Sequence, residues 1–245
     1  MKKLVLLALC LPFTARAYFQ MDFMKDKASA RASSRWTLAD WLTQKNKMSL
    51  ADQWLAMNRS VNLFDVNLSG GHNKYKVKTT DPLGNQVTVD NESMSYGADM
   101  YISFVNLFGE YEKTKDDQES YGGGLGLRLL GSSTQTTSLV VRYGWRRLRD
   151  LGSQEDWENQ FAEGELELYL IRAFGLTGKY RHYFPRNSNK GTRLAGHRVS
   201  AGAFFEFAVF RLFGNYYEEP TELGAPADRT TQKRAGVEGG LSLMF

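Results

Sequence analysis

Apolar and polar residues alternate along most of the chain, from about residue 61 to its end. In the last segment, all odd-numbered positions from Ala235 to Phe245 are apolar or glycine, whereas the charged residues Arg234 and Glu238 occupy even-numbered positions. The same period of two recurs around residues 94–104, 139–146, 163–170 and 198–209. It is typical of strands with one apolar and one polar face. Such segments of about ten residues, with aromatic residues near their ends, are typical of transmembrane β-barrels.

The spacing of these segments predicts a closed, antiparallel, all-β transmembrane barrel of about 10 strands, within a range of 8–12. Residues 69–71, which contain two glycines, are either a bulge in one long strand or a turn between two. We keep one strand, because an even total brings both ends of the barrel to the periplasmic side. The predicted strands are 61–80, 93–105, 108–113, 119–130, 135–148, 160–171, 175–184, 196–209, 213–219 and 231–245.

The predicted connections alternate between short and long. Outer-membrane barrels have short periplasmic turns and longer external loops, so this alternation supports a barrel. The short turns are expected at Val105–Gly109, Gly131–Ser133, Arg172–Gly175 and Arg211–Gly214. The long polar connections are expected at 81–92, 113–119, 149–158, 185–193 and 220–230.

Ahead of the barrel, the hydrophobic period becomes helical. Thr37 and Ser49 each begin a short similar sequence with an Asp three residues later, as at a capped helix start. Residues 36–58 are therefore predicted to form two short amphipathic helices, or one helix with a break near residues 45–47. Their apolar face can lie on a membrane interface, contact a partner subunit or pack on the chain itself. That face consists of Leu38, Trp41, Leu42, Trp54 and Leu55.

The first residues resemble a secretory signal peptide, with a basic start, an apolar run over 4–13 and a small-x-small site ending at Ala17. Three domains follow: a cleaved signal at 1–17, a linker with helices at 18–60 and a barrel at 61–245. Cleavage leaves 28 basic and 27 acidic residues, so charge does not indicate nucleic-acid binding. Cys10, the only cysteine, is lost as well, which excludes disulfides and thiol chemistry.

The chain ends in Gly-Leu-Ser-Leu-Met-Phe, with Leu241, Leu243 and Phe245 two residues apart. This end resembles the C-terminal insertion signal of Gram-negative outer-membrane proteins. The resemblance implies an outer-membrane location, contact with outer-membrane lipid and insertion by the barrel assembly machinery. The Trp-containing segment 36–58 is also similar to that of helix-plus-barrel outer-membrane proteins of predatory bacteria, and this similarity implies no activity.

The polar strand faces point into the predicted lumen, where acids and bases are nearly balanced. A barrel of eight to ten strands is narrow enough for side chains to fill it. Charges on neighbouring strands can pair there, and pairing makes their burial tolerable. We expect a salt-bridge network that closes the lumen. Its members are Asp99, Arg128, Arg142, Arg146, Glu163, Glu165, Glu167, Lys179, Arg181, Arg198, Glu206, Arg234 and Glu238.

These features favour a structural or interaction protein of the outer membrane, assembled as a homo-oligomer through its N-terminal helices. A narrow ion or small-solute channel is the first alternative. A lipid-directed hydrolase using His182 or His197 is the second, but the spacings match no catalytic motif. An enzyme is therefore not expected, and no catalytic residue is assigned. With three scattered histidines, no metal site and no cofactor are expected either.

Overall fold

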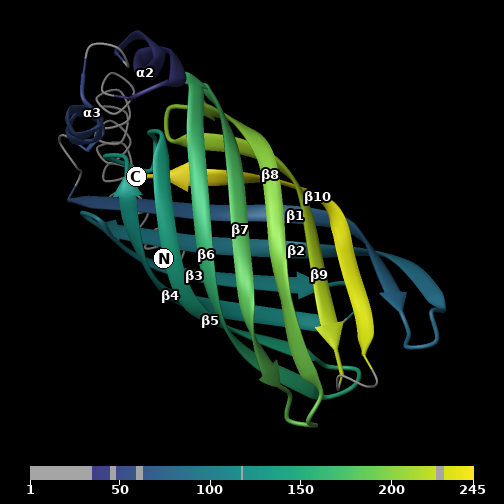
Figure 1. Cartoon of the computed structure of the whole chain (residues 1–245). Helices are drawn as coiled ribbons and strands as arrows, with labels where there is room; N and C mark the ends of the chain where they lie inside the picture. The colour runs from purple at the N-terminus through teal and green to yellow at the C-terminus, as the bar shows by residue number, and fades with distance from the viewer. Residues whose placement is uncertain (1–34, 45–47, 59–62, 117, 225–228) are drawn as a thin grey trace, which may run out of the picture.

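The computed structural model describes residues 35–44, 48–58, 63–116, 118–224 and 229–245. These residues form two short helices followed by ten antiparallel strands that close into one barrel (Figure 1). The predicted signal peptide and most of the predicted linker lie outside the described residues. The elements are α2 (Leu38–Gln44), α3 (Leu50–Met57), β1 (Phe64–Thr80), β2 (Gln86–Ile102), β3 (Val105–Thr114), β4 (Gln118–Leu130), β5 (Ser138–Asp150), β6 (Glu155–Ile171), β7 (Phe174–Asn187), β8 (Arg193–Phe207), β9 (Phe210–Leu223) and β10 (Thr230–Met244).

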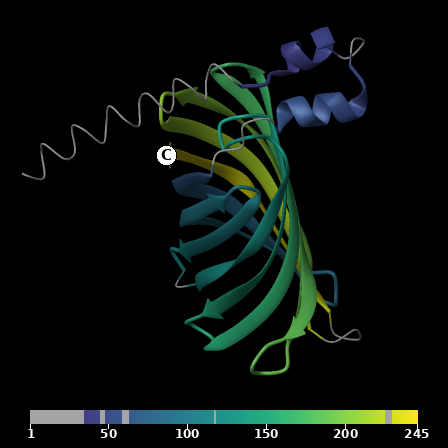
Figure 2. The same ribbon diagram turned by 90° about the vertical axis from the view of Figure 1, so that its left-hand side faces the viewer.

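The barrel closes where the last strand pairs with the first. The pairing runs without a register shift from Asn67 opposite Met244 to Thr80 opposite Thr231. β1 is therefore one strand through residues 69–71, with no bulge there in its pairing with β2 or β10. The predicted count of ten strands is confirmed. Because the count is even, the barrel begins and ends at the same end, next to the helices, which we call the inner end (Figures 1 and 2).

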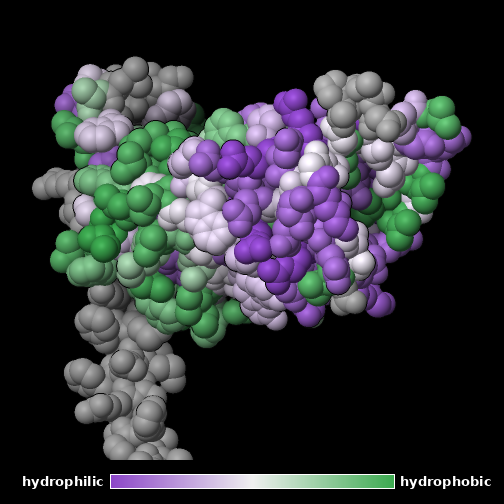
Figure 3. All heavy atoms as spheres, turned by 90° about the horizontal axis from the view of Figure 1, so that it is seen from below, coloured by the Kyte–Doolittle hydropathy of each residue, from purple (hydrophilic) through white to green (hydrophobic). Residues whose placement is uncertain are grey.

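Along each strand, side chains point alternately into the lumen and outward. On the face shown in Figure 3, apolar residues gather nearer the inner end, and the surface toward the outer end is mainly hydrophilic. Lipid tails require such an apolar band, whereas the outer half reaches beyond it. Every strand contributes an exposed apolar side chain, among them Leu68, Met94, Leu107, Leu125, Val141, Leu166, Leu176, Val199, Leu212 and Val237.

Most polar segments expected as long loops are in fact continuations of strands. β2 begins at Gln86 and β6 at Glu155, so the external connections shrink to 81–85, 115–117, 151–154, 188–192 and 224–229. The alternation of apolar and polar residues ends where the strands leave the apolar band. Backbone pairing has no such limit, because it does not depend on apolar side chains.

Two inner turns lie a few residues ahead of their predicted places. They are Ser103–Phe104 and Ala208–Val209, each a two-residue connection. Ser103 and Ala208 have φ values of 59° and 55°, the left-handed conformation that tight hairpins use. The prediction assigned the following glycines to the turns because glycine adopts this conformation easily. Those glycines lie inside β3 and β9 instead.

The connection between β4 and β5 is also not the short turn that was predicted. It extends over residues 131–137, and we call it the inner plug. All of its residues except Thr137 are buried, and Gln135 is fully inaccessible. A loop is normally solvated, since its backbone groups need hydrogen-bond partners. The inner plug therefore fills space at the inner mouth of the barrel.

The two predicted helices are present, and their caps are those expected. The Asp40 amide donates to Thr37 Oγ1 at 3.3 Å and the Asp52 amide to Ser49 Oγ at 3.2 Å. The helices lie at the inner end beside the barrel wall (Figure 2). Within the described part of the chain, neither helix is long and apolar enough to cross a membrane.

A lumen filled by ion pairs

The inward side chains form a nearly neutral charge network along the lumen. Ten carboxylates and nine cationic groups of the described residues take part in it. All thirteen residues named above as expected members are among them, and so are Asp65, Glu110 and Glu112, which the same alternation places inward. The carboxylates belong to Asp65, Asp99, Glu110, Glu112, Glu163, Glu165, Glu167, Glu206, Glu219 and Glu238, and the cations to Arg35, Arg128, Arg142, Arg146, Lys179, Arg181, Arg198, Arg211 and Arg234.

Arg142 on β5 is the centre of the middle layer. Its guanidinium bonds the Glu163 carboxylate at 2.8 Å and the Asp99 carboxylate at 3.1 Å, and it also pairs with Glu165. Its Nε donates to Asn106 Oδ1 at 2.9 Å. The Arg142 side chain is 6% exposed, and these four acceptors, together with the Tyr101 hydroxyl at 3.2 Å, replace the water that it loses. A guanidinium suits this position because its donors radiate in one plane.

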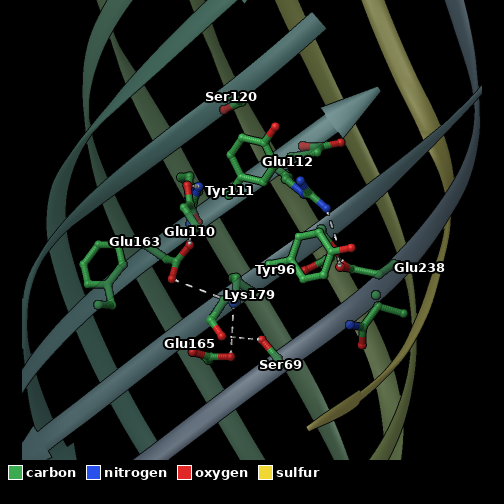
Figure 4. Close-up of a pocket in the computed structure, with 18 of the residues that line it drawn as sticks. Ser69, Tyr96, Glu110, Tyr111, Glu112, Ser120, Glu163, Glu165, Lys179 and Glu238 are labelled. Carbon is green, nitrogen blue, oxygen red and sulfur yellow. Dashed lines mark hydrogen bonds and ion pairs between the residues drawn. The ribbon is translucent and has the colours of Figure 1, made fainter. Parts of the chain in front are cut away.

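β7, which pairs with the other edge of β6, adds two more cations to the carboxylates of β6. Arg181 bonds Glu163 at 2.7 Å and Glu110 at 2.6 Å, so it joins β6 to β3 across the lumen. Lys179 lies 3.3 Å from Glu165 and, like Ser69, lines the pocket drawn in Figure 4. The middle layer is thus tied together across the barrel as well as between neighbouring strands.

Nearer the outer end, Glu219 on β9 and Glu112 on β3 collect three arginines. Arg146 Nη1 lies 2.9 Å from Glu219, and Arg234 Nη2 lies 2.6 Å from Glu112. Arg198 lies 3.9 Å from Glu219. The Glu219 side chain is 2% exposed, so its charge is compensated by these arginines rather than by bulk water.

At the inner end, Glu206 is the shared acceptor. Arg211 Nη2 bonds it at 2.7 Å, and the Tyr169 hydroxyl donates to it as well. Arg35, which precedes α2, reaches the same carboxylate at 2.7 Å. Arg211 also pairs with Glu167. The inner mouth is therefore closed by charged groups from the barrel and by one from the N-terminal segment.

Each lumenal arginine also stacks on an inward aromatic ring. A guanidinium over an aromatic face gains cation–π attraction, which is strongest where water is excluded. The centre of the guanidinium lies 4.0–5.6 Å from the ring centroid in these pairs. They are Arg35 with Tyr169, Arg128 with Tyr101, Arg142 with Phe108, Arg146 with Tyr183, Arg181 with Phe161, Arg198 with Tyr217, Arg211 with Phe204 and Arg234 with Tyr75.

Two hollows of about 190 and 170 Å³ remain inside the lumen. Both are lined by Ser69, Lys179 and Asn215, so they adjoin one another in the middle of the barrel. Their linings contain charges of both signs and many hydroxyl and amide groups. Space of this size and polarity suits water molecules or a small polar solute.

Sequence reasoning missed three members of the network. Arg211 was assigned to a turn, because the β8–β9 connection was placed too late. Glu219 was placed at the end of a shortened strand. Arg35 precedes the predicted helices, and nothing in its local sequence indicates entry into the lumen. Placing the β8–β9 turn at Ala208 would have put Arg211 inside β9. No local signal shows that Arg35 enters the lumen.

The predicted helix face is divided between contact and exposure. Leu38 and Trp41 are half-buried, whereas Leu42, Trp54 and Leu55 are 46–59% exposed. The Trp54 indole nevertheless donates to the Leu129 carbonyl of β4 at 3.1 Å.

Histidines and surface acids lie outside the lumen. His182 and His197 are paired across β7 and β8, face outward and contact the rings of Phe184 and Tyr180. Beyond the apolar band, Arg147 and Arg149 donate to Asp156 at 2.8 and 3.1 Å. These hydrogen bonds hold the pKa of Asp156 below its usual range. Among the described residues, no three potential ligands are grouped to hold a metal ion.

A closed antiparallel barrel with an apolar outer band and a charged lumen defines the class of this protein as a transmembrane β-barrel of the outer-membrane type. No protein-family model and no curated protein sequence matches the chain.

Several solved structures share the barrel architecture. The outer-membrane protease OmpT of Escherichia coli is 10% identical, with a TM-score of 0.46, over 74% of this chain and 96% of that one. The transport unit of the Escherichia coli autotransporter AIDA-I is 13% identical, with a TM-score of 0.32, over 86% and 97%. Neisserial surface protein A is 14% identical, with a TM-score of 0.27, over 72% and 96%. At this level of identity, the likeness concerns the fold only.

Proposed function

We propose that the protein is a structural barrel of the outer membrane, closed to solutes, that holds its N-terminal helices at the periplasmic side. The observation that carries the proposal is the pairing of lumenal charges in layers from the inner mouth to Glu112 and Glu219. Its partners would be outer-membrane lipid along the apolar band and the assembly machinery, which would read the last strand through Leu241, Leu243 and Phe245.

The wild-type protein is expected to give no steady single-channel current in a planar bilayer. Ions would have to break buried ion pairs to pass, since a barrel of this strand number leaves little free lumen. A large porin, reconstituted in the same way, is the positive control. A steady current from the wild type would overturn the closed lumen and favour the narrow channel instead, with the two central hollows as its widest part.

A second proposal concerns assembly. Leu42 and Leu55 are 56% and 59% exposed, and isolated helices rarely leave such residues in water on one face. They would be buried if the helices of neighbouring copies met, giving a homo-oligomer.

Replacing both Leu42 and Leu55 with Gln is expected to reduce the particle to a monomer in detergent, as measured by light scattering. The replacement removes apolar contact but leaves Arg35 and the barrel unchanged. Leu83→Gln, at an 88% exposed residue in the β1–β2 connection, is the matched control. If both variants keep the wild-type mass, the helices are not the contact.

A further inference from the structure

Arg35 occupies a pocket at the inner mouth that is built for a guanidinium group. Its Nη2 bonds Glu206 Oε2 at 2.7 Å, and its Nε donates to the Gln135 carbonyl at 2.5 Å. Its Nη1 donates to the Arg172 carbonyl. The guanidinium lies 4.3 Å from the centroid of the Tyr169 ring. One carboxylate, two carbonyls and an aromatic face thus surround a side chain that is 4% exposed.

This pocket is assembled from three separate parts of the barrel. Gln135 belongs to the inner plug, Arg172 to the β6–β7 turn and Glu206 to β8. The ligand comes from a fourth part, the segment ahead of α2. The three acceptors bond to three different nitrogens, Nε, Nη1 and Nη2, which a guanidinium holds in one plane, whereas an ammonium has a single nitrogen.

The charge of the pocket also calls for a cation. Glu167 and Glu206 face it from β6 and β8, and Arg211 from β9 is the barrel cation that pairs with both. Without Arg35, the two carboxylates share the single positive charge of Arg211, so one negative charge is not compensated. A buried carboxylate without a compensating charge is unfavourable, so the vacated pocket should attract a positive ligand.

We propose that the inner mouth is a guanidinium-binding site, that Arg35 is its tethered ligand, and that occupancy holds the inner plug in place. The plug is linked to the same group through other contacts. Gln135 Nε2 donates to the Ala208 carbonyl at 2.8 Å, and Arg211 donates to the Thr134 carbonyl at 3.0 Å. Thr137 Oγ1 donates to the Trp36 carbonyl at 3.0 Å. Emptying the pocket therefore loosens the plug and opens the hollow that Thr134 lines to solvent.

The test follows the accessibility of a cysteine placed behind the plug. Ser242 is 4% exposed and lines the same hollow as Thr134 of the plug. In a Cys10→Ser background, Ser242→Cys is the only thiol, and its reaction with a small thiosulfonate reagent reports opening. Arg35→Ala is expected to raise this rate about 10-fold to 100-fold, because charge-assisted bonds that keep the plug closed are lost.

Methylguanidinium, in millimolar excess, is expected to return the rate of Arg35→Ala towards that of the wild type. Methylammonium should not, and Arg35→Lys should react nearly as fast as Arg35→Ala. Arg172→Ala is the matched control, since the pocket uses only the carbonyl of that residue and its side chain is exposed. This control should react at the wild-type rate.

Three results would overturn the proposal. They are an unchanged rate in Arg35→Ala, equal rescue by methylammonium, and acceleration by Arg172→Ala that matches the effect of Arg35→Ala. Folding of each variant is checked by its heat-dependent electrophoretic mobility, so that a misfolded barrel is not counted as an open one. The conductance of the wild-type protein tests the proposed closed lumen separately. That measurement involves neither the Arg35→Ala variant nor its added ligand.

Discussion

Arg142→Met is expected to lower the free energy of unfolding of the barrel by about 3–5 kcal/mol, the range for breaking a buried ion pair on one side. Asp99, Glu163 and Glu165 would lose a shared cation, and Lys179 and Arg181 can neutralise only part of that charge. Methionine fills much of the space of the arginine stem, so the effect is mainly electrostatic. Urea titration of the protein in detergent micelles or vesicles measures the change.

Arg149→Met is the matched control for this variant. Arg149 lies on the same strand and also pairs with an acid, Asp156 at 3.1 Å, but its side chain is 38% exposed. Exposed pairs contribute about 0–1 kcal/mol, because water solvates both charges after the pair is broken. If the two variants lose the same stability, the middle layer of the lumen is hydrated rather than dry.

Leu125→Arg is expected to lower the free energy of unfolding by about 2–4 kcal/mol in lipid vesicles, as charges near the middle of a bilayer do on the lipid face of a barrel. Leu125 is 60% exposed and stands in the middle of the outward row from Tyr121 to Leu129 on β4. Its cross-strand neighbours are Leu107 and Tyr143. An arginine there would have to leave water for hydrocarbon.

The control for Leu125→Arg is Leu83→Arg. Leu83 is 88% exposed in the β1–β2 connection at the outer end, where water remains available. The same substitution should leave stability within about 0.5 kcal/mol, as surface changes usually do. Equal losses from both variants, or none from Leu125→Arg, would contradict the placement of the apolar band in lipid.

The barrel could be predicted from the sequence because its main signal is local. A residue two positions away shares the same strand face, so a short window shows which side chains meet lipid and which enter the lumen. That parity placed Arg142 and Glu163 on one inward face, and the structure pairs them directly across β5 and β6. The alternation also predicted ten strands, although it ended several of them, such as β2 and β6, too near the apolar band.

The remaining features depend on contacts between distant parts of the chain. Arg35 meets Gln135 and Glu206, which are 100 and 171 residues away, and no periodicity links them. The inner plug contains Ser, Thr and Gln, a composition that indicates a solvated turn unless its buried partners are known. The arginine–aromatic pairs were also missed, because alternation gives the face of a ring but not its neighbour across the lumen.

The seam between β1 and β10 has a kinetic consequence. Asn67 and Met244 are partners although almost the whole barrel separates them in sequence, so the chain must close a very large loop before this pairing forms. Long-range pairing of this kind slows folding, and two unpaired strand edges stay open to other chains meanwhile. The rate of barrel closure, and the risk of aggregation before it, should therefore depend on how long the edge of β1 stays unpaired before β10 joins it.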